Sequence, residues 1–311
     1  MKKFDIVGII DVLPDFYLKV DKFPEVGEKV IVKFLGWFGG GMVGNFSYVA
    51  SKLGLSVALM GKLPQDKFST ESIKELRNCG VNLDSIRMQK NSLNRPFTIV
   101  VIDSSSERTI FVVPNITESV TLTKRERDLI SKSKILYATL SNLAIEREAI
   151  LIAKRYGVKV CANLEAMYLR NAPDIFKLFK NIDILIFNKK SFKEISKKGF
   201  EETTAKKILS EGSELIVITK GKEGCTVYSQ KEKLNFPSYK VNVIDTTGAG
   251  DCFSAAFLFG YINNWGFKKT SLFASAAAAL STTQLGPRPM FCSYQEIVKA
   301  QRNMKSVSNF N

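Results

Sequence analysis

The chain has 311 residues, 45% of them hydrophobic, and a formal net charge of +15. It contains no histidine, which excludes Ser-His-Asp and Cys-His catalysis and leaves carboxylates, Lys, Tyr and Cys as general bases. The cysteines are scattered without C-x-x-C spacing, so we expect no zinc site, no disulfide framework and a reducing, cytoplasmic compartment.

The positive charge is spread over most predicted helices rather than concentrated in one arm. It therefore favours attraction of small anions, and we expect no nucleic-acid partner. No stretch approaches the roughly 18 uninterrupted apolar residues of a membrane span. Residues 1–7 lack the long apolar core of a signal peptide, so no membrane association is expected either.

Strand-like and helix-like segments alternate from the start of the chain. Residues 4–10 form an apolar run interrupted only by Asp5, typical of a strand buried on both faces. The glycines at 39–41 precede an amphipathic helix that ends at Gly54. A strand at 56–60 and a helix at 65–79 follow. This alternation predicts a largely parallel sheet with helices on both faces.

Two stretches without helical periodicity interrupt the alternation. Residues 15–35 consist of short strands broken at Pro24 and Gly27. The second stretch contains strands at 86–88, 97–102 and 109–113. We expect the strands of both stretches to form one small sheet outside the main body.

After residue 123 the alternation resumes, and helices at about 267–283 and 293–305 end the chain. No internal repeat or long linker divides the sequence, so we expect a single domain over residues 1–311. Strands are predicted at 135–138, 158–162, 184–187, 215–219 and 241–244.

The segment 245–251, Asp-Thr-Thr-Gly-Ala-Gly-Asp, links the last of these strands to a helix. Gly248 and Gly250 let bare N–H groups approach a ligand, and the helix start adds unpaired donors, which together favour binding of phosphate. A carboxylate at Asp251 then suggests a base that accepts the proton of an attacking alcohol. The alternative is a glycine-containing turn in which Asp251 only favours the first helical turn.

This segment resembles in full the C-terminal signature, D-T-x-G-A-G-D, of the ribokinase-like (pfkB) carbohydrate kinases. The resemblance implies a three-layer α/β/α domain with a mostly parallel central sheet and a small β-sheet lid formed by residues 12–35 and 85–118. It also implies transfer of the γ-phosphoryl group of Mg-ATP to a hydroxyl of a sugar or sugar-like substrate, with Asp251 as general base. The amides of the implied anion hole are those of Gly248, Ala249, Gly250 and Asp251.

The spacing of Gly40, Gly41 and Asn45 matches G-G-x-x-x-N, the N-terminal signature of that family, in which the Asn binds sugar hydroxyls. Glycines at this junction allow a ligand to approach, and Asn45 offers both a donor and an acceptor. An ordinary glycine-rich turn with a solvent-facing Asn is the alternative.

The family also contacts substrate through an Asp after the first strand. Counting back from the Pro24 turn favours Asp15, whereas counting forward from Gly8 lands nearer Asp11. We prefer Asp15 and keep both residues as candidates. A turn-forming aspartate beside Pro14 is the alternative.

Residues 219–224 fit the T-x-G-x-x-G pattern that the family uses for nucleotide binding. They follow an apolar strand, where open α/β sheets bind ligands. The residues expected to line the site are Thr219, Gly221 and Gly224. A hairpin turn between Ile218 and Cys225 is the alternative and is compatible with this function.

Asn188 begins the N-x-x-E motif of the family, but Ser191 stands where the family has a Glu that helps organise Mg²⁺. Glu194 lies one helical turn later. Either Glu194 substitutes for the missing Glu or metal handling is altered. Asn188 could equally serve only as a helix cap.

Two weaker resemblances concern cations and adenine. Asp245, Thr247 and Gly286 resemble the monovalent-cation site of the family, which implies a K⁺ requirement. The alanine-rich helix that contains Ala278 could form one wall of an adenine slot, although core packing explains the alanines equally well.

A nucleoside kinase is the alternative function, because residues 163–168 are similar to the N-L-S-A-P region of adenosine kinases. The lid aromatics that could stack a base are Phe16, Phe34, Trp37 and Phe38. A nucleotide-binding regulatory module without turnover is a second alternative, which Ser191 favours and Asp251 opposes. The G-x-G-x-x-G fingerprint of a Rossmann dehydrogenase is absent after the first strand, which argues against that class. Exposed lid edges favour a homodimer through the lid.

Overall fold

The computed structural model describes residues 2–90, 95–104, 108–114, 121–170, 173–196 and 199–307. Within them a nine-stranded sheet has the order β13-β12-β11-β10-β9-β8-β1-β4-β5. The pairs from β11 to β5 are parallel, and β12 and β13 are antiparallel at one edge. The strands are β1 (Phe4–Ile9), β4 (Val57–Pro64), β5 (Asn82–Gln89), β8 (Ser133–Ala138), β9 (Lys159–Leu164), β10 (Ile184–Asn188), β11 (Leu215–Thr219), β12 (Cys225–Ser229) and β13 (Lys233–Phe236).

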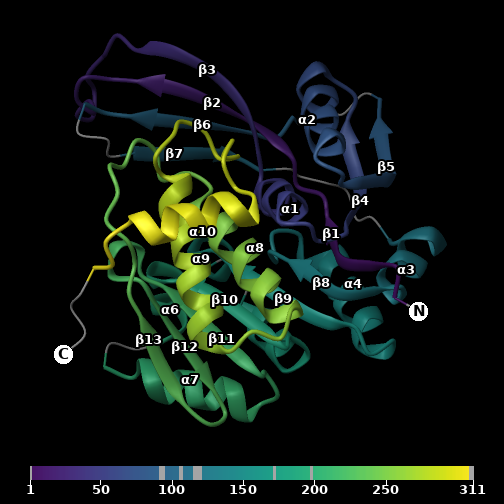
Figure 1. Ribbon diagram of the computed structural model, residues 1–311. Helices are drawn as coiled ribbons and strands as arrows, with labels where there is room; N and C mark the ends of the chain where they lie inside the picture. The colour runs from purple at the N-terminus through teal and green to yellow at the C-terminus, as the bar shows by residue number, and fades with distance from the viewer. Residues whose placement is uncertain are drawn as a thin grey trace.

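Helices cover both faces of this sheet, which confirms the three-layer arrangement (Figure 1). Successive strand residues point to opposite faces, so Ile6 enters one core and Val7 the other. The first core is covered by α1 (Met42–Lys52), α2 (Lys67–Asn78), α8 (Ala249–Ile262), α9 (Phe267–Ser281) and α10 (Tyr294–Asn303). The second is covered by α3 (Lys124–Ser131), α4 (Leu143–Arg155), α5 (Ala166–Arg170), α6 (Lys189–Ile195), α7 (Glu201–Ser210) and the 3-10 segment Pro173–Asn181.

A separate four-stranded sheet, which we call the lid, lies across one end of the layers (Figure 1). Its order is β3-β2-β6-β7, with β2 parallel to β6 and the other pairs antiparallel. The lid strands are β2 (Leu13–Lys19), β3 (Lys33–Gly40), β6 (Phe97–Ile102) and β7 (Arg108–Val113). Residues 115–118 of the predicted lid lie outside the described residues.

Three details of the sequence prediction were wrong. The strand at 86–88 belongs to β5 and pairs with β4 in the central sheet, not with the lid. Residues 241–244 are not a strand; the Ile244 amide donates to the Thr282 carbonyl (2.8 Å), and the side chain is half exposed. The antiparallel strands β12 and β13 were not predicted. Among the described residues, none of the helices has the length and apolar character needed to cross a bilayer.

Candidate active site

The phosphate-binding segment predicted at 248–251 forms the start of α8. Gly248 caps the helix at φ 75°, in the left-handed region, and a Cβ there would collide with the Pro287 carbonyl. The Ala249 amide donates to the Thr246 carbonyl at 3.3 Å. The amides of Gly250 and Asp251 have no protein acceptor among the described residues, so this helix end offers free donors and its positive dipole to an anion.

Asp251 lies in the first turn of α8 and is 7% exposed. Its Oδ2 accepts a hydrogen bond from Nδ2 of Asn45, on α1, at 3.0 Å. Burial raises the pKa of Asp251 well above its usual range, and the nearby carboxylates of Asp11, Glu165 and Asp15 raise it further. A buried carboxylate of this kind is a stronger base than a surface aspartate.

Asp15 and Asp11, the two candidates for substrate contact, both lie near Asp251. Asp15, on β2, accepts a hydrogen bond from the Thr98 hydroxyl, and burial raises its pKa to about 6. Asp11 accepts from the amides of Val43 (2.8 Å) and Gly44 (3.3 Å) at the start of α1, and burial raises its pKa to about 7. Both side chains already have protein partners, so the preference for Asp15 stays a prediction.

The glycines before α1 have steric roles that the sequence pattern did not indicate. A Cβ at Gly40 would collide with the carboxylate of Asp15, and a Cβ at Gly41, whose φ is 90°, would collide with the Asp11 carbonyl. The motif therefore makes room for the two aspartates.

Asn188 ends β10 and caps α6. The helix cap that we gave as the alternative role of Asn188 is therefore present. Its Oδ1 accepts from the Ser191 amide (2.8 Å), and the Ser191 hydroxyl accepts from the Asn188 amide (2.9 Å), forming a capping box. Ser191 thus has a structural function at this position. Glu194 pairs instead with Arg170 through Nε at 2.9 Å.

Glu165 is a partly buried carboxylate that the sequence patterns did not assign to this site. It follows β9 directly and accepts a hydrogen bond from Nδ2 of Asn188 at 2.8 Å. Burial raises its pKa, and its charge acts on Asp251. Its position at the carboxyl end of a parallel strand was the available signal, since ligands of open sheets bind at that edge.

The predicted nucleotide loop, residues 219–224, joins the antiparallel strands β11 and β12. It is therefore the hairpin turn that the sequence offered as an alternative, and this turn is compatible with nucleotide binding. The Thr219 hydroxyl donates to the Phe187 carbonyl at 3.3 Å. Gly221 and Gly224 have φ of 58° and 89°, and a Cβ at Gly224 would collide with the Phe236 carbonyl. Ala278, on α9, packs against the core. Contact of these residues with a nucleotide stays a prediction.

Asp245 is surrounded by protein donors. Its Oδ2 accepts from the Tyr17 hydroxyl (2.9 Å) and the Gly286 amide (3.0 Å), and its Oδ1 accepts from the amide and hydroxyl of Thr247 (2.8 and 2.7 Å). Arg108, on lid strand β7, places Nη1 3.6 Å from Oδ1 and 3.2 Å from the Thr247 hydroxyl. Both carboxylate oxygens have protein donors, and the predicted monovalent-cation site at Asp245, Thr247 and Gly286 stays a prediction.

The four lid aromatics divide between two clusters and an exposed position. Phe16 and Trp37 each pack edge-on against Phe68 of α2, with ring centroids 5.3 and 5.0 Å apart. Phe38 packs against Tyr17 at 4.9 Å, and Phe34 is exposed. The four rings therefore do not form one stacking platform.

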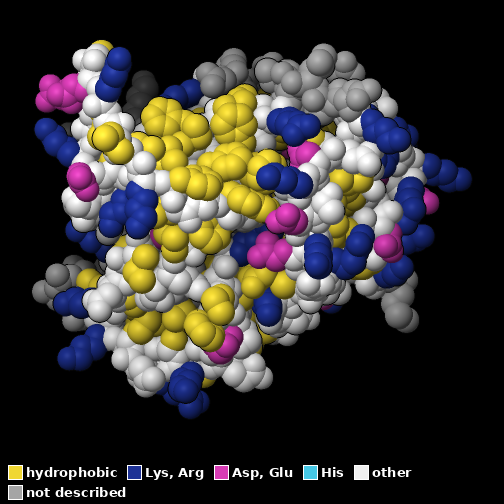
Figure 2. All heavy atoms as spheres, turned by 90° about the horizontal axis from the view of Figure 1, so that it is seen from above, with side chains coloured by type: hydrophobic (Ala, Val, Ile, Leu, Met, Phe, Trp, Pro, Cys, Tyr) yellow, Lys and Arg dark blue, Asp and Glu magenta, His cyan; other side chains and the backbone are white. Residues whose placement is uncertain are grey.

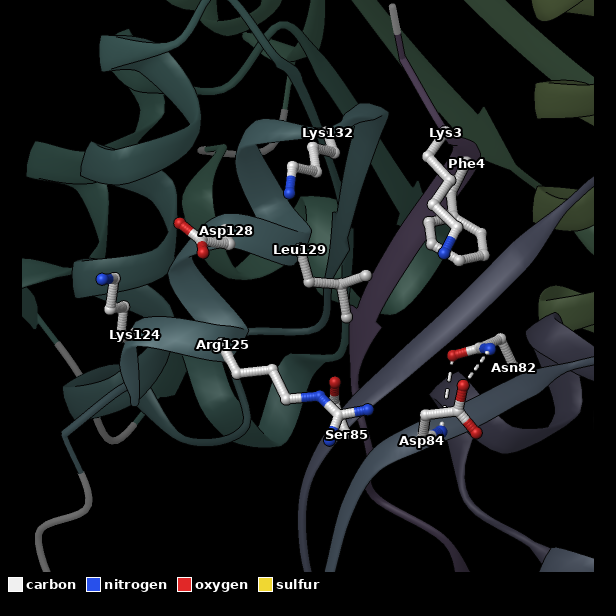
Figure 3. A pocket seen from close by; sticks show the side chains of 10 residues that line it. All are labelled: Lys3, Phe4, Asn82, Asp84, Ser85, Lys124, Arg125, Asp128, Leu129 and Lys132. Carbon is white, nitrogen blue, oxygen red and sulfur yellow. Dashed lines mark hydrogen bonds between the residues drawn. The ribbon is translucent and has the colours of Figure 1, made fainter.

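A hollow of about 480 Å³ lies between α3 and the strands β1 and β5, apart from the candidate site (Figure 3). Lys3, Lys124, Arg125 and Lys132 line it, but these cations are exposed. One carboxylate in it, that of Asp84, accepts from Asn82 at 2.8 Å. It contains none of the candidate site residues and has the character of a surface hollow.

Residues 1–291 match the model of the pfkB family carbohydrate kinases. A 5-dehydro-2-deoxygluconokinase of Clostridium beijerinckii is 28% identical over 300 residues, covering 90% of this chain and 87% of that protein. A probable fructokinase-5 of Arabidopsis thaliana is 28% identical over 315 residues, covering 93% and 95%. The structure of a putative ribokinase II from E. coli in complex with ATP and Mg²⁺ has the same fold, with a TM-score of 0.80 at 18% identity over 96% of this chain and 99% of that one.

Proposed function

Because the chain belongs to the pfkB family of carbohydrate kinases, we propose that it transfers the γ-phosphoryl group of ATP to a sugar hydroxyl with Asp251 as general base. The observation that carries this mechanism is the buried Asp251 carboxylate beside the free amides at the start of α8. Asn45 engages Oδ2 of Asp251, which leaves Oδ1 for the acceptor hydroxyl. The amides stabilise the charge that develops on the transferred group.

A sugar acceptor is favoured over a nucleoside. The curated relatives named above are sugar kinases, and Phe16, Trp37 and Phe38 already pack edge-on against protein rings. The test is ATP consumption with D-fructose, D-ribose, 5-dehydro-2-deoxy-D-gluconate and adenosine as acceptors. Turnover with adenosine alone would replace the sugar assignment. ATP binding without turnover on a broad panel would favour the regulatory module.

Glu165 is the residue best placed to supply the carboxylate that Ser191 lacks. Within the described chain no group of three acidic or thiol side chains could hold a metal alone, so Mg²⁺ would arrive with the ATP phosphates. Glu165 offers a partly buried carboxylate oxygen beside Asn188 and near Asp251, which suits Mg²⁺. Bound Mg²⁺ would neutralise phosphate charge; Glu165 would orient it directly or through water.

Glu165→Gln is therefore expected to raise the Mg²⁺ concentration for half-maximal activity by about tenfold. Gln keeps an acceptor for Asn188 and removes only the charge. Binding of Mn²⁺ with a non-hydrolysable ATP analogue, followed by electron paramagnetic resonance, should weaken in parallel. Glu194→Gln is the matched control, because that carboxylate pairs with Arg170. Equal effects of the two substitutions would rule out the role of Glu165.

Three further expectations stay predictions. K⁺ dependence is the least supported, because Arg108 already places a positive charge beside Asp245. A cytoplasmic location is consistent with the use of ATP and with five free cysteines. Nucleic acid is not expected as a partner, because the positive charge is explained by anionic substrates.

We also propose a homodimer through the lid. Strand β7 is an edge of the lid sheet, and it exposes Ile110, Phe111, Val112 and Val113. Figure 2, which looks down on the lid end of the molecule, shows hydrophobic side chains gathered at that end. Pairing would cover both the apolar surface and the open strand edge.

Phe111→Glu is expected to convert this dimer to a monomer, measured by size-exclusion chromatography with light scattering. A charge at Phe111, which is 57% exposed, would be buried in the interface. Phe200→Glu is the matched control, since Phe200 is 58% exposed just before α7, away from the lid. A wild-type protein that is monomeric at micromolar concentration would contradict the proposal.

A further inference from the structure

The guanidinium of Arg288 is buried between the lid and α1. Its side chain is 3% exposed. A Cβ at Gly39 would lie 2.6 Å from Nη1, and a Cβ at Gly44 would lie 2.7 Å from Nη2. Glycines on both sides thus leave the space that the guanidinium fills.

Arg288 connects the lid with both helices beneath it. Its Nη2 donates to the carbonyl of Gly40 on β3 (3.1 Å), its Nε to Oδ1 of Asn45 on α1 (3.4 Å), and its Nη1 to the carboxylate of Glu75 on α2. Each nitrogen therefore has an acceptor, as a buried guanidinium requires.

These contacts determine the orientation of the Asn45 amide. A guanidinium has only donors, so the side of Asn45 that faces Arg288 must be the oxygen. The opposite side is then Nδ2, which donates to Oδ2 of Asp251 at 3.0 Å. An ionised carboxylate only accepts, so both neighbours require the same orientation of the amide.

We propose that Arg288 is a positioning residue that holds Asn45 so that its NH₂ group faces Asp251 and the acceptor. The inference rests on the proposed kinase function and extends it with a relay from Glu75 through Arg288 and Asn45 to Asp251. Without Arg288, the Asn45 amide loses the donor that holds its Oδ1, and only the bond to Asp251 still fixes it, so the side chain can swing away from the carboxylate. The base then loses the partner that orients it toward the hydroxyl.

The test is a double-mutant cycle of Arg288→Met and Asn45→Ala, measured with ATP and whichever acceptor of the panel above the wild type phosphorylates. Arg288→Met alone is expected to lower kcat on the order of 10- to 100-fold, with KM for ATP changed less than about twofold. In the Asn45→Ala background it should cause little further loss, because Arg288 acts through Asn45. Arg302→Met, on the exposed face of α10, is the matched control and should leave kcat unchanged.

Additive losses in the cycle would overturn the proposal, since they would mean that Arg288 acts independently of Asn45. If Arg288→Met does not fold, Arg288→Lys takes its place; Lys keeps the charge and loses the planar fork. A wild type that phosphorylates no acceptor would instead refute the proposed function. A cycle of thermal unfolding on the ligand-free protein would still decide whether Arg288 and Asn45 are coupled.

Discussion

Asp251→Asn is expected to lower kcat on the order of a hundredfold or more, because the amide cannot accept the proton of the acceptor hydroxyl. The substitution preserves shape, and its oxygen can still accept from Nδ2 of Asn45, which lies 3.0 Å from Oδ2. It also removes a carboxylate whose burial is unfavourable, so the protein should unfold at the same temperature as the wild type or higher.

The measurement is ATP-dependent phosphorylation of the identified acceptor, with thermal unfolding followed by circular dichroism. Asp128→Asn, an exposed position on α3, is the matched control and should leave both unchanged. A loss of kcat smaller than about tenfold would exclude Asp251 as the general base.

The same carboxylate should shape the pH profile. Burial raises the pKa of Asp251, so the ionised form needed for catalysis is lost as pH falls through that raised value. Activity should therefore rise with pH on a limb displaced above the range of ordinary aspartates. The charges of Asp11, Asp15 and Glu165 act on Asp251, so the apparent pKa of this limb is a property of all four carboxylates together.

Most of the fold could be predicted because its strands are buried on both faces. Ile6 and Val7, adjacent on β1, enter different cores, and such strands read as continuous apolar runs. Strand β5 was assigned to the wrong sheet because it alternates in polarity like a lid strand. Which strand it pairs with, as in the pairing of Gly61 on β4 with Ile86, cannot be predicted from the local sequence pattern. Residues 241–244 contain three apolar residues, but among the described residues no strand pairs with them.

The residues of the candidate site also fall into two groups, those that the sequence predicted and those that only the structure revealed. Asp251 and Asn45 lie in short signatures, so resemblance identified both although they are 206 positions apart. Arg288, Arg108 and Glu165 lie outside those signatures. Arg288 reaches Gly40 across 248 positions. An arginine in sequence is most simply interpreted as a solvated surface charge, and only folding shows that glycines surround it.

Gly248→Ala is expected to cost about 2–4 kcal/mol of unfolding free energy and to abolish most activity. The φ of 75° at this cap is unfavourable for any residue with a side chain, and the added Cβ would collide with the Pro287 carbonyl. To relieve the collision the 286–288 loop must move. That loop carries the Gly286 amide bound to Asp245 and the Arg288 side chain, so the displacement would reach both ends of the site.

Gly250→Ala, two residues further on, should separate stability from function. Its φ is not positive, and no atom lies within 4 Å of an added Cβ, so the unfolding free energy should stay within about 1 kcal/mol of the wild type. Activity should nevertheless fall, because the methyl group would occupy open space at the helix end where the phosphoryl group is expected. Unfolding monitored by urea titration and kcat for both variants provide the comparison. If Gly248→Ala proved as stable as Gly250→Ala, the left-handed cap would not be the constraint that holds this end of α8 in place.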